Sequence, residues 1–166
     1  MGSEIERKFL LKDQSWRKSV SAPFRTFTQG YFVRGQGGPT LRVRIADDRA
    51  FLTIKGRARG SENLERSEFE YEIPLEDAQA MLEEFCGTRI VKKRRYLVPA
   101  DSGLVWEIDE YFELNAGLFT AEIELPDADT PFDRPEWLGR EVSGDPRYSN
   151  GSLSSNPFTL WNDENE

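Results

Sequence analysis

Apolar and polar residues alternate along most of the chain with a period of two, which is typical of half-buried β-strands. The alternation predicts eight strands, over residues 3–11, 26–34, 40–46, 50–57, 66–74, 91–98, 104–112 and 118–126. Turn residues at 46–49 and 100–103 predict two hairpins, one from the third and fourth strands and one from the sixth and seventh. Eight strands with few helices favour an antiparallel sheet that closes on itself, or two packed sheets.

Helical spacing is confined to short segments. One helix is predicted to follow Pro74, to end at Gly87 and to pack against the outside of the sheet. It is indicated by apolar residues at helical spacing, which are Leu75, Ala78, Met81, Leu82 and Phe85. Shorter helices are predicted around 14–20 and around 134–140, the latter beginning near Pro135. A last helix or irregular segment is expected to begin near Ser149.

The amino-acid composition limits the kinds of catalysis and of metal site that the chain can support. The 166 residues predict one domain, residues 1–160, followed by an acidic tail over 161–166. The chain has 22 Lys and Arg, 30 Asp and Glu, a net charge of −8 and no histidine. The absence of histidine excludes Ser-His-Asp and Cys-His catalysis and His-ligated zinc. Because Cys86 is the single cysteine, a disulfide framework is excluded, and any metal is expected to be a hard cation bound by oxygen.

The sequence gives little sign of targeting to a membrane or to nucleic acid. Its first residues are charged and no apolar segment follows them, which argues against a signal peptide. No run of eighteen apolar residues predicts a membrane span. The net negative charge argues against a general nucleic-acid binder. We therefore expect a cytoplasmic protein with neither a membrane nor a nucleic-acid partner.

Seven of the eight predicted strands carry charge on their polar face. The positions are Glu4, Glu6 and Lys8; Arg42 and Arg44; Lys55, beside Thr53; Glu68, Glu70 and Glu72; Lys93 and Arg95; Glu107 and Asp109; and Glu122 and Glu124. An ordinary sheet with this face in water is one explanation. However, uncharged polar residues are scarce on these faces, and the sign of the charge is sorted strand by strand. Both observations favour the interior of a closed barrel.

A charged interior has a definite physical use. Six cations in one lumen repel one another unless a polyanion lies among them. Arginine guanidinium groups bind phosphate oxygens in pairs, and lysines add point charge. Carboxylates do not bind the same phosphates directly, but they hold a divalent cation that the phosphates also bind. The pattern therefore predicts a metal-complexed polyphosphate as the ligand.

Short motifs follow one another along the chain: Glu4-Ile5-Glu6-Arg7-Lys8, Gln29-Gly30-Tyr31, Leu41-Arg42-Val43-Arg44, Thr53-Ile54-Lys55, Glu70-Tyr71-Glu72, Lys93-Arg94-Arg95-Tyr96, Trp106-Glu107-Ile108-Asp109, Glu122-Ile123-Glu124 and Arg147-Tyr148-Ser149-Asn150. In this order they resemble the CYTH, or triphosphate tunnel metalloenzyme, superfamily over roughly residues 3–155. The short bacterial members, which resemble inorganic triphosphatases, are the most similar in layout.

The resemblance implies a closed eight-stranded antiparallel barrel, mainly β with a few helices outside, that hydrolyses a triphosphate with Mg²⁺ or Mn²⁺. It implies that the triphosphate is bound by Lys8, Arg42, Arg44, Lys55, Lys93 and Arg95. It implies that the metal is bound, directly or through water, by Glu4, Glu6, Asp109, Glu122 and Glu124. It further implies that Lys8 and Tyr31 are catalytic, positioning or protonating one end of the substrate.

Several alternatives stay open at the level of sequence. The same tunnel serves thiamine triphosphatases and class IV adenylate cyclases, and a polyphosphate- or nucleotide-binding module without turnover fits the charge pattern too. A homodimer is compatible with the sequence. The glycine-rich segment 34–38 resembles a phosphate-binding loop but lacks the Lys-Ser/Thr and the following helix of a P-loop, so we interpret it as a strand connection.

Overall fold

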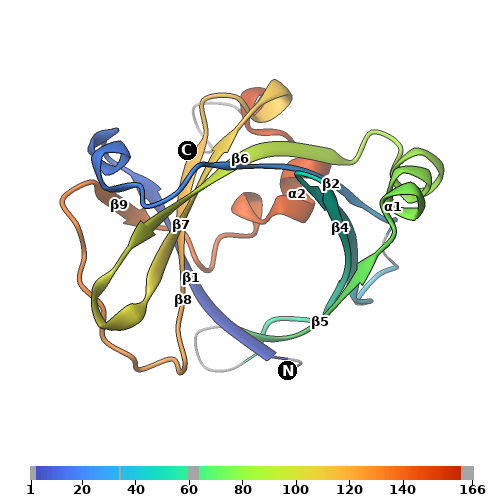
Figure 1. Ribbon diagram of the computed structural model, residues 1–166. Coiled ribbons are helices and arrows are strands. Elements are labelled where there is room, and N and C mark those ends of the chain that lie inside the picture. Colours follow the sequence, from blue (N-terminus) through green and yellow to red (C-terminus); the bar gives the residue numbers. More distant parts are fainter. Residues whose placement is uncertain (1–2, 34, 60–63, 162–166) are drawn as a thin grey trace.

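The computed structural model describes residues 3–33, 35–59 and 64–161, in which one antiparallel sheet closes into a barrel (Figure 1). Its strands are β1 (Ser3–Leu11), β2 (Arg25–Tyr31), β3 (Thr40–Ala46), β4 (Arg49–Lys55), β5 (Glu65–Ile73), β6 (Ile90–Pro99), β7 (Val105–Tyr111), β8 (Phe119–Glu124) and β9 (Leu138–Glu141). They are ordered β5-β4-β3-β2-β6-β7-β8-β1-β9, and a pairing of β5 with β1 closes the ring. The predicted eight-stranded closed barrel is confirmed, with β9 as an additional strand.

Both predicted hairpins are present. Strands β3 and β4 pair up to Ala46 and Arg49, and Asp47 takes the positive φ of 55° that this tight turn requires. Strands β6 and β7 pair from Lys93 to Pro99. Strand β2 ends at Tyr31, three residues earlier than expected, and Arg34 of the glycine-rich segment lies outside the described residues.

Short helices surround the barrel. The helix predicted after Pro74 is observed as α1 (Leu75–Met81), which continues as the π-turn η2 (Leu82–Cys86) and ends at Gly87 with φ of 59°. The expected segments near 14–20 and Ser149 correspond to the 3₁₀ helix η1 (Ser15–Ser19) and to α2 (Asn150–Ser155). The remaining 3₁₀ turns are η3 (Asp101–Gly103), η4 (Glu113–Asn115), η5 (Pro146–Tyr148) and η6 (Phe158–Leu160). Among the described residues, no helix is long and apolar enough to cross a membrane.

The prediction of a helix around residues 134–140 is wrong. After a turn at Pro135, residues 138–141 form β9, which pairs with the second half of β1. The Val142 amide extends this pairing by donating to the Lys8 carbonyl at 2.8 Å. Gly139 permits the close approach, because a Cβ there would lie 2.9 Å from the Leu10 carbonyl oxygen. A free edge on β1 therefore outweighed the local helical preference of this segment.

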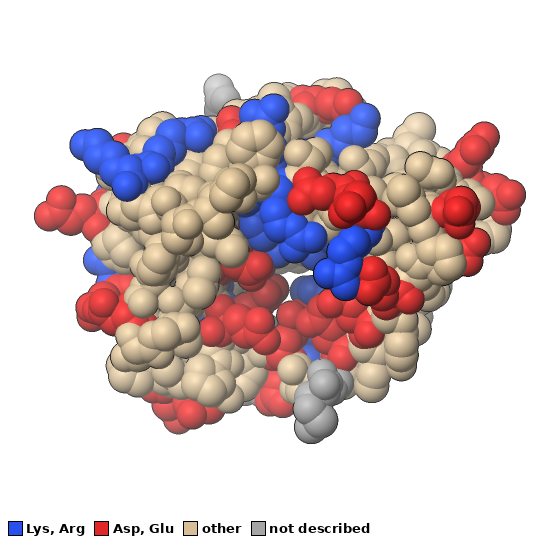
Figure 2. Space-filling view, in the orientation of Figure 1, with Lys and Arg blue, Asp and Glu red and all other residues tan. Residues whose placement is uncertain are grey.

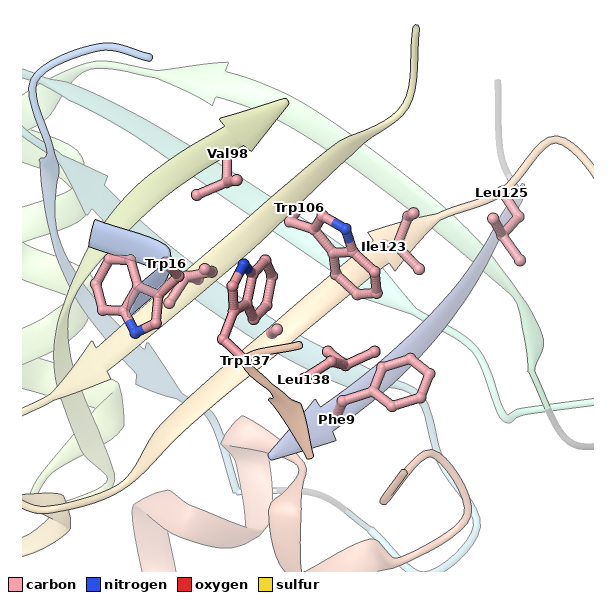
Figure 3. Close-up of a cluster of buried hydrophobic side chains, with 10 residues drawn as sticks. Phe9, Trp16, Val98, Trp106, Ile123, Leu125, Trp137 and Leu138 are labelled. Carbon is pink, nitrogen blue, oxygen red and sulfur yellow. The ribbon is translucent and has the colours of Figure 1, made fainter. Parts of the chain in front are cut away.

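A large cluster of buried hydrophobic side chains lies outside the barrel wall. Successive strand residues face opposite sides of a sheet, so Trp106 and Ile108 on β7 point away from the interior that Glu107 faces. Figure 3 shows Trp106 beside Phe9, Trp137 and Leu138, which cover this side of the wall. Trp106 meets Phe9 and Trp137 edge to face, with ring centroids 5.7 and 5.6 Å apart. The apolar faces of these strands are thus buried under loops and β9, and the interior is lined in large part by charged side chains.

On the opposite side, α1 and η2 cover β3 and β4 and meet β2 at Gly30. A Cβ on Gly30 would lie 2.6 Å from Leu82 Cδ2 and 2.7 Å from Cys86 Sγ. We expect Gly30→Ala to lower the free energy of unfolding by about 1–3 kcal/mol, because the added methyl group overpacks a close helix–sheet contact. Denaturant unfolding measures this. Gly144→Ala is the control, because nothing lies within 4 Å of its Cβ position; equal stabilities of the two variants would contradict this packing.

Candidate active site

The barrel encloses a cavity of about 1590 Å³ lined by the charged strand faces. Lining residues come from each of the strands β1 to β8, and they include Glu6, Arg44, Lys55, Lys93 and Glu122. Figure 2 shows basic side chains gathered on one side of the central hollow and acidic side chains on the other. The charged faces therefore line a tunnel, and the alternative of an ordinary sheet with this face in water is wrong.

Strand β3 supplies two arginines whose guanidinium groups are only partly used by the protein. Arg42 is buried, and its Nη2 donates to Thr53 Oγ1 at 3.1 Å and lies 3.6 Å from Glu70. Among the described residues, the buried Arg42 Nε has no hydrogen-bond partner. Arg44 donates from Nε to Gln29 Oε1 at 2.9 Å and lies over the Phe27 ring, 4.4 Å from its centroid. An anion in the tunnel would satisfy the donors that remain.

Strand β6 adds Lys93 and Arg95, which both bind Asp109 on the neighbouring β7. Lys93 Nζ lies 2.7 Å from Asp109 Oδ2, and Arg95 holds both carboxylate oxygens at 2.8 and 2.9 Å. Burial, together with Arg95 and Arg44, lowers the pKa of Lys93 to about 7 although Asp109 opposes the shift. Burial alone would raise the pKa of Asp109, but the two cations outweigh it and the pKa falls. Asp109, expected among the metal ligands, is thus placed with the cations.

The first carboxyl pair lies where β1 meets β8. Burial and the neighbouring Glu122 raise the pKa of Glu6 to about 8. Burial opposes ionisation of Glu122 as well, but Lys8, Arg95 and Lys93 hold its pKa well below the usual range, and Glu6 donates a hydrogen bond to it. Lys8 Nζ lies 3.1 Å from Glu122. At neutral pH this pair therefore holds one proton and one negative charge.

A second pair joins β1 to β5. Burial and a hydrogen bond to Glu4 raise the pKa of Glu68 to about 7. Burial would also raise the pKa of Glu4, but Glu68, Lys55 and Arg66 together lower it to about 2. Lys55 and Arg66 lie 3.0 and 3.1 Å from Glu4 Oε1. From sequence, Glu68 was named only as a charged position on the polar face of its strand, and Arg66 was not named, although both share the alternating face of β5.

Carboxyl oxygens of Glu4, Glu6, Glu122 and Glu124 line the acidic side of the tunnel and are the candidate ligands for a metal there. Within residues 3–33, 35–59 and 64–161, no group of three or more carboxylates converges into a ready metal site. Glu124 is only partly covered by its neighbours, and this partial burial, together with the charges of Glu4 and Glu107, raises its pKa. In each of the two carboxyl pairs, Glu6–Glu122 and Glu4–Glu68, one proton reduces the repulsion between the two groups. A hard divalent cation prefers such carboxylate oxygens and would replace that proton.

The two expected catalytic residues both line the cavity but form separate contacts. Lys8 Nζ contacts Glu122 and donates to the Tyr148 carbonyl at 3.0 Å. Tyr31 accepts a hydrogen bond at its hydroxyl from Gln29 Nε2 at 2.7 Å. The structure therefore places both in the tunnel wall and does not join them directly.

The C-terminal segment completes the tunnel wall. Residues 142–146, Tyr148 and residues on α2 line the cavity, and Figure 1 shows α2 within the outline of the barrel. Leu153 on α2 is buried and packs in one cluster with Tyr31, Tyr111 and Tyr148. This end of the tunnel is thus built by residues that lie more than a hundred positions from β1 in the sequence.

A closed antiparallel barrel lined by opposed basic and acidic side chains is the tunnel architecture that the sequence resemblance implied. Residues 2–154 match the CYTH domain, and the chain belongs to this family, whose triphosphate tunnel enzymes are metal-dependent.

Two curated relatives extend over nearly the whole chain. The inorganic triphosphatase of Acetivibrio thermocellus is 40% identical over 158 residues, 95% of this chain and 97% of that protein. The inorganic triphosphatase of Nitrosomonas europaea is 31% identical over 154 residues, 92% of this chain and 97% of that protein. Among solved structures, that of the inorganic triphosphatase NE1496 matches with a TM-score of 0.64 and 29% identity, over 93% of this chain and 95% of the other.

Proposed function

We propose that this CYTH enzyme hydrolyses inorganic triphosphate to diphosphate and phosphate with the help of a divalent metal ion. The observation that carries the proposal is the divided tunnel, in which guanidinium and ammonium groups face carboxyl pairs across one cavity. The named activity of both curated relatives supports it. The proposed triphosphate ligands are Lys8, Arg42, Arg44, Lys55, Lys93 and Arg95.

The proposed metal is Mg²⁺ or Mn²⁺, since both prefer carboxylate and water oxygens. Glu4, Glu6, Glu122 and Glu124 would hold it. Asp109, whose charge acts on Glu122 and whose oxygens bind Lys93 and Arg95, would contribute through water. The bound ion would neutralise charge that develops on the phosphoryl oxygens.

In the proposed reaction, the cations hold the triphosphate extended so that a water molecule attacks a terminal phosphorus in line. A new P–O bond forms to the water oxygen, the bridging P–O bond breaks, and its electron pair leaves with diphosphate. A tunnel carboxylate accepts the proton of the attacking water, because the chain has no histidine. Lys8 and Tyr31 position the leaving group, to which the Tyr31 hydroxyl can donate a hydrogen bond.

Phosphate release from inorganic triphosphate, thiamine triphosphate and ATP, each with Mg²⁺, with Mn²⁺ and without metal, tests this function. We expect metal-dependent release with the highest kcat/KM for inorganic triphosphate. A higher kcat/KM for thiamine triphosphate, or the appearance of cyclic AMP from ATP, would replace the proposed substrate. Tight triphosphate binding without release under any condition would instead favour a binding module.

Metal binding is expected to release a proton from the Glu6–Glu122 pair. The pKa of Glu6 is raised to about 8, so at about pH 7 the metal-free pair is protonated, and a cation requires both carboxylates ionised. Metal affinity should therefore rise with pH until about pH 8 and then level off. Calorimetry in buffers of different ionisation enthalpy measures the released proton. Glu6→Gln should release none from this pair, and equal release by both proteins would contradict this assignment.

Three further expectations remain predictions. They are a cytoplasmic location, the absence of membrane and nucleic-acid partners, and the compatibility of the chain with a homodimer. Size-exclusion chromatography with light scattering tests the last of these.

A further inference from the structure

Two uncharged side chains lie among the charges of the tunnel and bind to each other. Gln29 on β2 is completely buried. Its Oε1 accepts from Arg44 Nε at 2.9 Å, while its Nε2 donates to the Tyr31 hydroxyl at 2.7 Å and to Asn150 Oδ1 at 3.2 Å. A single amide thus connects a proposed triphosphate ligand, a proposed catalytic residue and the first residue of α2.

Asn150 is the second uncharged residue that forms hydrogen bonds to several strands. Its Oδ1 accepts from Gln29 Nε2, from Lys93 Nζ at 3.0 Å and from the Tyr111 hydroxyl at 3.3 Å. These donors stand on three different strands, β2, β6 and β7. An amide oxygen can hold an ammonium group without adding a negative charge that would repel a phosphate. This makes asparagine better suited than aspartate beside Lys93.

The docking of α2 has other supports besides Asn150. Leu153 is buried among aromatic side chains, and Asn115 Nδ2 donates to its carbonyl at 3.5 Å. Ser149 caps the helix by accepting from the Ser152 amide at 3.2 Å. The backbone at Gly151 approaches the Tyr31 ring, since a Cβ there would lie 3.7 Å from it. The bonds of Asn150 are therefore available to orient its partners, with the helix already anchored.

We propose that Asn150 and Gln29 are positioning residues, whose linked amides fix Lys93, Arg44 and Tyr31 relative to one another for triphosphate binding and cleavage. This inference rests on the proposed function. Besides Asn150, Lys93 Nζ donates to Asp109 Oδ2, whereas Arg44 and Tyr31 both form hydrogen bonds with Gln29. Docking of α2 thereby completes the geometry of a site whose proposed triphosphate and metal ligands stand on the barrel strands.

A double-mutant cycle tests the linkage. Asn150→Ala and Gln29→Met, which keeps the buried volume, should each lower kcat/KM for inorganic triphosphate about tenfold, since each removes a positioning hydrogen bond. Because the two amides act through one connection, the double variant should lose about as much as one single variant, and a hundredfold loss is not expected. Asn156→Ala is the matched control, because this exposed asparagine at the end of α2 lies outside the network.

Melting temperatures separate positioning from folding. Asn150→Asp keeps the shape and the acceptor oxygen, so it should melt like the wild type but raise KM about tenfold or more, because its charge opposes a phosphate beside Lys93. Wild-type kinetics in both Asn150→Ala and Asn150→Asp would overturn the inference, and so would losses that multiply in the double variant. If the wild type itself releases no phosphate, the proposed function fails first, and that result is distinct from either.

Discussion

Replacement of Arg44 by alanine is expected to raise KM for inorganic triphosphate about 100-fold, because a charge-assisted guanidinium–phosphate contact is worth about 1.5–3 kcal/mol and each 1.4 kcal/mol is a factor of ten. Burial, with Arg42 and Arg95 nearby, lowers the pKa of Arg44 to about 9, so the group stays charged at neutral pH. Because Arg42, Arg44 and Arg95 repel one another, an anion bound among them would stabilise their charged forms. The turnover number should fall much less, because five other cations still hold the substrate.

Two further variants test whether the loss comes from the guanidinium group of Arg44 inside the tunnel. Arg44→Lys keeps the charge but loses the planar fork, so its KM should lie between those of the wild type and Arg44→Ala. Arg49→Ala is the control, because Arg49 is exposed at the start of β4, pairs with Glu72 at 2.7 Å and is not among the residues that line the cavity. Initial rates over a range of triphosphate concentrations measure all three. A wild-type KM for Arg44→Ala would show that this face does not bind substrate.

Replacement of Glu122 by glutamine is expected to lower metal-dependent kcat about 1,000-fold, because a metal that neutralises transferring phosphoryl groups contributes several kcal/mol and each 1.36 kcal/mol is tenfold. The amide removes the negative charge of the Glu6–Glu122 pair and the partner of Lys8. The fold should be retained, since a large cluster of buried hydrophobic side chains lies on the other side of the barrel wall.

The measurement for this variant combines phosphate release with a calorimetric Mn²⁺ titration and a melting curve. Metal affinity should fall together with kcat. Glu72→Gln is the control, because Glu72 is exposed and pairs with Arg49 outside the cavity lining. Unchanged Mn²⁺ affinity in Glu122→Gln would remove Glu122 from the metal site even if activity were lost.

Much of the barrel could be predicted from the sequence because strand alternation is a local property. Each of the eight predicted strands is present, and the charged positions on one face of seven of them follow from a period of two. The helical spacing after Pro74 was equally local, and α1 with η2 confirms it. The segment that became β9 could not be predicted in this way, because the edge of β1 on which it pairs is formed by residues far from it in the chain.

The sequence predicted which residues line the candidate site. Which of these residues contact one another depends on the register between neighbouring strands, which the sequence pattern does not give. Arg95 lies directly opposite Asp109, and Lys8 lies opposite Glu122. These registers, together with burial, put Asp109 among cations and leave Glu6 beside Glu122 with a proton. Gln29 and Asn150 are single uncharged residues, so the charge pattern gave them no role.

The sequence by itself determined that the chain is mainly β and that most of its strands carry charge on one face, since alternation and charge type depend on neighbouring residues in each strand. That the sheet closes into a barrel was implied by the resemblance to the CYTH superfamily. Only the tertiary structure decided which charges meet, where the carboxyl pairs lie, and that α2 enters the tunnel wall to bind Lys93 and Gln29 through Asn150. The physical reason is the range of the interactions. Side-chain alternation depends on adjacent residues, whereas an ion pair or a shared proton depends on distances of a few ångströms between strands that only folding brings together.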